Sequence, residues 1–106
     1  MSALRRVVAL SSDLMDRSKI TAAYPDAVIV RSPAKLVQEA TSATLVLVDL
    51  ARLNDPAALL AIDAPVVAYG SHIDDAALAA AEAAGAEALP RSVFFRRLES
   101  GDVDPG

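Results

Sequence analysis

The chain has 106 residues, the size of one domain, and is 54% hydrophobic but only 4% aromatic, so alanine, valine and leucine must build its core. It has no cysteine, which excludes disulfides, thiolate zinc sites and a cysteine nucleophile. The net charge of −4 argues against nucleic-acid binding, and no apolar run approaches the roughly 20 residues that cross a bilayer. No signal-peptide pattern opens the chain, so we expect a cytoplasmic protein without a membrane partner.

Short apolar runs rich in β-branched residues predict the strands. Four of them are continuous rather than alternating, which is typical of strands buried on both faces of a parallel sheet. A fifth run is weaker. In chain order the predicted strands are Arg6–Leu10, Ala27–Val30, Thr44–Val48, Pro65–Tyr69 and Glu87–Leu89.

Capping signals between these runs predict five helices. Ser32 and Asp55 each precede a proline at the first helical position. Asp13 is followed by Asp16 three residues later, and Gly85 ends an alanine-rich run. The predicted helices are Asp13 to about Tyr24, Ala34–Ala40, Ala57–Ile62, Ala76–Ala84 capped by Asp74 or Asp75, and Val93–Leu98 capped by Ser92.

This alternation of strand and helix predicts an α/β fold with three layers. The sheet is expected to have five parallel strands in the flavodoxin-like order 2-1-3-4-5, with helices on both faces. The domain is expected to cover residues 1–98, and residues 99–106 to form a flexible C-terminal tail. In this strand order, ligands bind in the crevice at the carboxyl ends of the strands.

Polar residues follow several of the predicted strands. The third strand is followed by Asp49. Because parallel strands end at one edge of the sheet, these side chains are expected to converge there. They are Ser11, Ser12, Asp13, Asp49, Ser71, His72 and Arg91.

Three segments resemble the receiver domain of bacterial response regulators (CheY-like). The run from Val7 to Met15 is similar to the receiver's first strand and acidic turn, Leu45–Asp49 to its third strand, and Ala83–Leu89 to the run into its fifth strand. The resemblance reaches to about Leu98. In that family an acidic pair and the third-strand aspartate bind Mg²⁺, and that aspartate accepts a phosphoryl group. A hydroxyl after strand four and a lysine after strand five contact the phosphoryl group.

The resemblance implies a phosphoacceptor role for Asp49 and a metal-ligand role for Asp13 and Asp49, with Mg²⁺ as the one cofactor that it suggests. The sequence departs from the family at three places. Ser12 replaces one acid, Gly70 occupies the hydroxyl position with Ser71 one residue later, and Arg91 replaces the lysine.

Other interpretations of these residues stay open. Asp13 is also a good N-cap. Ser12, Ser71 and Arg91 could hold an anion in the crevice, but we favour an internal ion pair of Arg91 with Asp49 or Asp13. His72, the only histidine, is either structural or sensitive to pH.

Phe94 and Phe95 make the last predicted helix apolar on more than one face, so they are either buried or part of a protein interface. No Gly-x-Ser-x-Gly turn or glycine-rich phosphate loop is present, which argues against a hydrolase or a dinucleotide site. An enzyme is not expected.

The leading hypothesis is a stand-alone, atypical receiver-like module (a pseudo-receiver) of two-component signalling that acts through protein contacts. The contact surface would be the fourth helix, fifth strand and fifth helix, including Arg91–Leu98. The partner would be a kinase, a downstream effector or a second copy. The alternatives are a phosphoacceptor that uses Asp49 with weakly bound Mg²⁺, and a binder of small anionic ligands.

Overall fold

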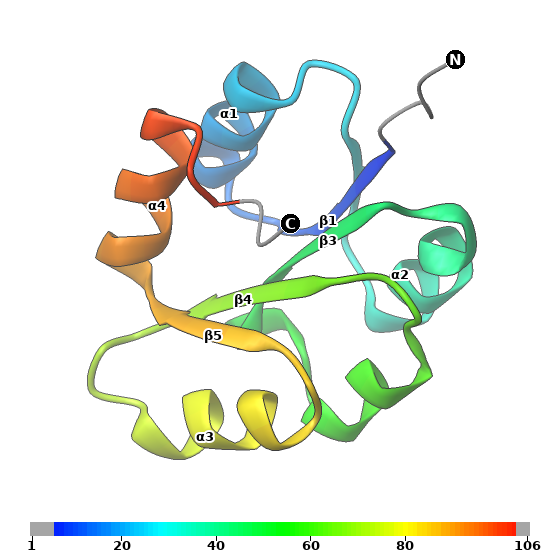
Figure 1. Cartoon of the computed structure of the whole chain (residues 1–106), viewed down its shortest axis with the longest axis vertical. Helices are drawn as coiled ribbons and strands as arrows, with labels where there is room; N and C mark the ends of the chain where they lie inside the picture. The colour runs from blue at the N-terminus through cyan, green and yellow to red at the C-terminus, as the bar shows by residue number, and fades with distance from the viewer. Residues whose placement is uncertain (1–5, 104–106) are drawn as a thin grey trace.

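The computed structural model describes residues 6–103 and shows one five-stranded parallel sheet (Figure 1). The strand order is β2-β1-β3-β4-β5, which confirms the flavodoxin-like prediction. Each strand begins and ends within one residue of its predicted bounds. The strands are β1 (Val7–Leu10), β2 (Val28–Val30), β3 (Leu45–Asp49), β4 (Val66–Gly70) and β5 (Glu87–Pro90).

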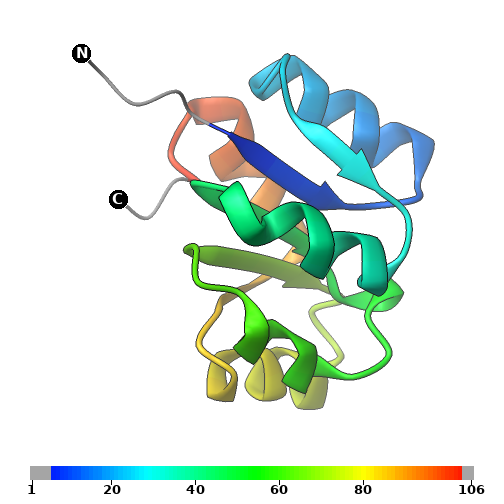
Figure 2. The same ribbon diagram turned by 90° about the vertical axis from the view of Figure 1, so that its right-hand side faces the viewer.

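Helices cover both faces of the sheet, which gives the predicted three layers (Figures 1 and 2). The helices α1 (Leu14–Ala23) and α4 (Arg91–Ser100) pack on one face. The other face carries α2 (Pro33–Glu39) and α3 (Asp75–Ala83), together with the 3₁₀ helix η3 (Pro56–Ala61). The 3₁₀ turns η1 (Ala40–Ser42) and η2 (Leu50–Arg52) bracket β3. No helix within residues 6–103 is long and apolar enough to cross a membrane.

The predicted helix starts are confirmed at three caps. The side chains of Asp13, Ser32 and Asp74 each accept a hydrogen bond from the backbone N–H three residues later, at 3.1–3.2 Å. These bonds satisfy N–H groups that have no partner inside the helix.

The predicted helix 57–62 is a 3₁₀ helix instead. Its amides bond three residues back: Ala58 donates to the Asp55 carbonyl and Ile62 to the Leu59 carbonyl. Four residues separate its end at Ala61 from β4, and 3₁₀ turns are frequent in short connectors of this kind.

The last helix also departs from the prediction. It begins at Arg91 with Pro90 in the capping position, so Ser92 lies in the first turn and is not the cap. It continues to Ser100 and ends at Gly101, whose φ of 77° suits glycine. Val103 is buried against the same core, so the folded part extends past the predicted boundary at Leu98. The remainder of the predicted tail, 104–106, lies outside the described residues.

The register aligns the carboxyl ends of β3, β4 and β5. Asp49 of β3 pairs with Tyr69 of β4, and Gly70 pairs with Pro90 of β5. This pairing brings Asp49, Tyr69 and Arg91 to the same edge of the sheet, where α1 begins. The fold therefore gathers these side chains at the edge of the sheet where the sequence predicts the crevice.

Candidate functional site

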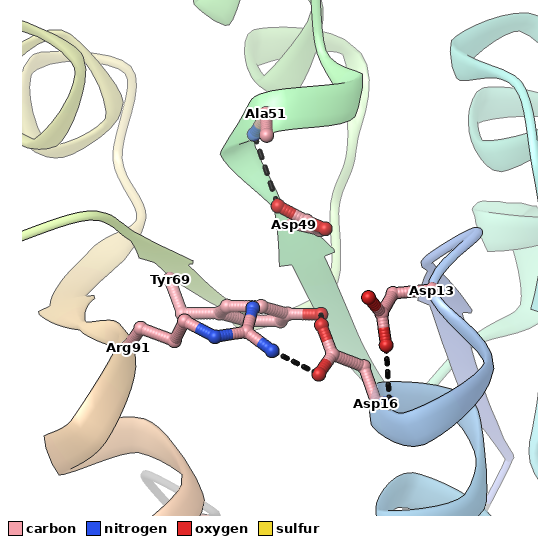
Figure 3. A network of polar contacts seen from close by, with 6 residues as sticks. All are labelled: Asp13, Asp16, Asp49, Ala51, Tyr69 and Arg91. Carbon is pink, nitrogen blue, oxygen red and sulfur yellow. Dashed lines mark hydrogen bonds and ion pairs between the residues drawn. The ribbon is translucent and has the colours of Figure 1, made fainter.

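The centre of the crevice is an ion pair between Asp16 and Arg91 (Figure 3). Asp16 lies in the first turn of α1 and is fully buried. Its Oδ1 accepts a hydrogen bond from Arg91 Nη2, and its Oδ2 accepts one from the Tyr69 hydroxyl at 3.3 Å. Both oxygens of the carboxylate therefore have a donor, as a buried charge requires.

Arg91 lies between this carboxylate and two aromatic rings. Its guanidinium carbon is 5.0 Å from the ring centre of Phe95 and 5.7 Å from that of Tyr69, within range of cation–π attraction. The hydrogen bond with Asp16 is the main cause that raises the Arg91 pKa. About half of the arginine side chain, 46%, faces solvent, whereas its partner is not exposed at all. Arg91 therefore pairs with the buried Asp16 while part of its own side chain stays in contact with solvent.

Three aromatic rings, those of Tyr69, Phe94 and Phe95, pack together beside the ion pair. Tyr69 stacks on Phe94 with ring centres 4.3 Å apart, and Phe95 meets both rings edge-on. Lys19 of α1 places its ammonium 4.9 Å from the Phe95 ring centre. The cluster and the ion pair thus join α1 to α4 across β4.

The burial of these rings corrects the interface prediction for Phe94 and Phe95. Phe94 is fully buried and Phe95 is 7% exposed, because both pack on Tyr69 and the sheet. Neither ring offers an exposed apolar surface to a partner. Burial also raises the Tyr69 pKa well above 10.0, with the nearby charges of Asp49 and Asp16 adding to the effect.

Asp49 is the last residue of β3 and is 7% exposed. Its Oδ1 accepts a hydrogen bond of 3.0 Å from the backbone N–H of Ala51, which caps η2. Burial raises its pKa, the Ala51 bond opposes that shift, and the negative charge of Asp16 reinforces it. Arg91 and Arg52 lower it by smaller amounts. Asp49 is therefore a partly desolvated acid without a salt bridge among the described residues.

The other predicted crevice residues lie outside this network. Asp13 is exposed and caps α1 by accepting the Asp16 backbone N–H at 3.1 Å. Ser71 is exposed, and its hydroxyl accepts the Ile73 backbone N–H at 3.4 Å. The Ser12 hydroxyl is buried without a hydrogen-bond partner in the part of the chain that is described. His72 is exposed in the turn before α3.

The favoured internal ion pair does form, but with a different acid from either one predicted. Arg91 binds Asp16, not Asp49 or Asp13. The sequence interpretation placed Asp16 at a helix start and missed its role, as it missed that of Tyr69. One signal was available: Asp16 lies four residues before Ile20, so it shares the buried face of α1.

The carboxylates do not fit a Mg²⁺ site in this arrangement. Mg²⁺ needs several free oxygen ligands in an octahedral shell. Both oxygens of Asp16 are bonded to Arg91 and Tyr69. Asp13 and Asp49 each have Oδ1 bonded to a backbone amide, so only one oxygen on each is left for a metal ion. Within residues 6–103, no three His, Cys, Asp or Glu side chains come together as a metal-ligand group.

Comparison with known proteins identifies the fold. No family model and no curated protein matches the sequence. Among solved structures, a response regulator from Hahella chejuensis is 18% identical with a TM-score of 0.76, over 93% of this chain and 92% of that one. The phosphorylated cyanobacterial phytochrome response regulator RcpA is 16% identical with a TM-score of 0.73, over 95% and 90%. A CheY-like protein, tadZ, from Pseudomonas aeruginosa PAO1 is 19% identical with a TM-score of 0.62, over 90% and 99%.

The chain therefore has the fold of a CheY-like response-regulator receiver domain. More than nine-tenths of its length takes part in the first two of these matches, so the likeness covers the whole domain and not a shared fragment.

Proposed function

We propose that this protein is an atypical receiver-like signalling module that acts through protein contacts, without phosphorylation that depends on Mg²⁺. The observation that carries the proposal is the Asp16–Arg91 ion pair at the centre of the crevice. It places a buried carboxylate of the chain on the cation that, in the receiver resemblance, would neutralise a phosphoryl group.

The raised pKa of Asp49 and the groups around it support the same proposal. A phosphoacceptor aspartate reacts as the ionised carboxylate, and the transfer depends on positioning and on neutralisation of charge. Here burial and the neighbouring Asp16 raise the Asp49 pKa, and Arg91 is hydrogen-bonded to Asp16. Arg91, which stands at the lysine position of the receiver resemblance, is therefore already paired, and within residues 6–103 no group of three His, Cys, Asp or Glu side chains could hold a metal ion beside Asp49.

The proposed contact surface is the face formed by α3, β5 and α4. Its polar positions include Ser92, Arg96 and Glu99, which are exposed on α4. An ion pair of 3.1 Å between Arg97 and Glu87 ties α4 to β5 along the same face. The partner would be a kinase, a downstream effector or a second copy of the chain, and the proposed role is not that of an enzyme.

Incubation with Mg²⁺ and acetyl phosphate, followed by intact mass measurement, tests this proposal. We expect no phosphoryl adduct on the wild-type chain. The Asp49→Asn variant is the matched control, because its amide can still accept the Ala51 N–H. An adduct on the wild type that is absent from the variant would contradict the proposal and establish the phosphoacceptor alternative.

A further inference from the structure

The two members of the central ion pair differ in their access to solvent. Arg91 carries five N–H donors, and within residues 6–103 the only hydrogen bond of its side chain is the one from Nη2 to Asp16. Its side chain is 46% exposed and is held over the rings of Tyr69 and Phe95. A rigid guanidinium with free donors facing solvent is a good binder of phosphate-class oxyanions.

Asp16 opposes such binding in two ways. Its charge already neutralises the guanidinium, and it would repel a second anion at short range. An incoming anion that displaced Asp16 would also leave a fully buried carboxylate with only the Tyr69 hydroxyl, which is a costly state. A free anion therefore competes poorly with Asp16.

We propose that Asp16 autoinhibits an oxyanion site on Arg91, so that a phosphate-class anion binds at the strand ends only when the Asp16 carboxylate is removed or withdrawn. This inference rests on the proposed function, in which the ion pair takes the place of metal and phosphoryl group. Beyond that function, Arg91 would form an anion site that the Asp16 side chain keeps closed.

The first turn of α1 offers a way to withdraw the carboxylate. Leu14 and Met15 precede Asp16 in this turn, and they are 72% and 68% exposed although they are large and apolar. A protein that covers these two side chains would contact the same turn that inserts Asp16. A contact that shifted this turn would therefore also move the carboxylate that is bonded to Arg91.

Titration with inorganic phosphate, at constant ionic strength and followed by NMR chemical shifts of the Arg91 and Ser92 amides, tests the inference. We expect Asp16→Asn to bind phosphate roughly tenfold to a hundredfold more tightly than the wild type, the range that hydrogen bonds to a charged group supply. Adding Arg91→Gln to this variant should abolish the gain. Glu87→Gln is the matched control, because it frees the exposed Arg97 without touching the crevice.

Equal phosphate affinity in wild type and Asp16→Asn would overturn the inference, as would a gain that survives Arg91→Gln or that Glu87→Gln reproduces. Asp16→Ser, which also removes the charge and keeps a polar group for Tyr69, repeats the test if the asparagine variant does not fold. Failure here is distinct from failure of the proposed function, because phosphate binding is reversible and leaves no mass adduct on Asp49.

Discussion

The two faces of the sheet are built from the same strands but differ in chemistry. Residues that alternate along β1, β3 and β4 point to opposite sides. On the side of α2 and α3 the buried cluster is entirely aliphatic. On the side of α1 and α4 it contains Tyr69, Phe94 and Phe95, and the buried Asp16 lies against Tyr69. The aliphatic cluster thus provides packing, whereas the aromatic cluster also contacts the Asp16–Arg91 ion pair at the strand ends.

The largest expected effect on stability comes from removing one ring of the aromatic cluster. Phe94→Ala should lower the free energy of unfolding by about 3–5 kcal/mol, because it leaves a cavity under Tyr69. Leu36→Ala, the matched variant on the aliphatic face, should cost about 2–5 kcal/mol. Urea unfolding measures both.

Circular dichroism of the same two variants tests whether the two faces of the sheet are chemically separate. Near-UV circular dichroism of tyrosine should change in folded Phe94→Ala and stay close to wild type in Leu36→Ala, since only the first touches the Tyr69 ring. Equal changes in both would mean that the two faces are not chemically separate.

A smaller effect is expected from Tyr69→Phe, which removes the hydroxyl that donates to Asp16 at 3.3 Å. The loss should be about 1 kcal/mol at pH 7, since Arg91 still pairs with the acid. The raised Tyr69 pKa predicts a further difference at alkaline pH. The folded state holds this proton more tightly than the unfolded state, so wild-type stability falls as pH rises above 10.

Tyr69→Phe should remove that part of the alkaline loss, which thermal unfolding between pH 8 and pH 11 would show. If the variant and the wild type lose stability in parallel over this range, the buried position of the Tyr69 hydroxyl next to Asp16 is contradicted.

The smallest expected effect is a gain in stability from Asp49→Asn. Burial raises the Asp49 pKa, so the folded state disfavours its charge more than the unfolded state does. The contribution of this group to stability is fully present below its ordinary pKa of 3.8 and is lost as pH rises through the raised value. The variant should therefore be more stable than wild type at pH 7 and similar at pH 3. A variant that is less stable at pH 7 would contradict this sign.

The sequence predicted the sheet because its strands are continuous apolar runs, a pattern that few other arrangements produce. It also predicted the caps at Asp13 and Ser32, and narrowed the third to Asp74 or Asp75, because a local side-chain bond determines each helix start. The type of helix at 56–61 and the end of α4 depend on tertiary packing, which local patterns do not encode.

The site was predicted only in part, for a similar reason. Strand ends gave Asp49 and Arg91, because topology alone brings them together. The partner of Arg91 depends on which acid of α1 faces inward: Asp13 caps the helix and stays exposed, while Asp16 lies on the buried face with Ile20. Phe94 and Phe95 were ambiguous because a short apolar helix does not reveal which of its faces are covered.

The most direct test of this account is a pair of double-mutant cycles on the two arginine ion pairs of α4. Asp16→Asn with Arg91→Gln should give a coupling energy of about 1–3 kcal/mol, because one partner is fully buried. Glu87→Gln with Arg97→Gln should give about 0.5 kcal/mol or less, because both partners are near 40% exposed. A coupling for Asp16 and Arg91 no larger than that of the exposed pair would contradict the claim that Asp16 firmly occupies Arg91.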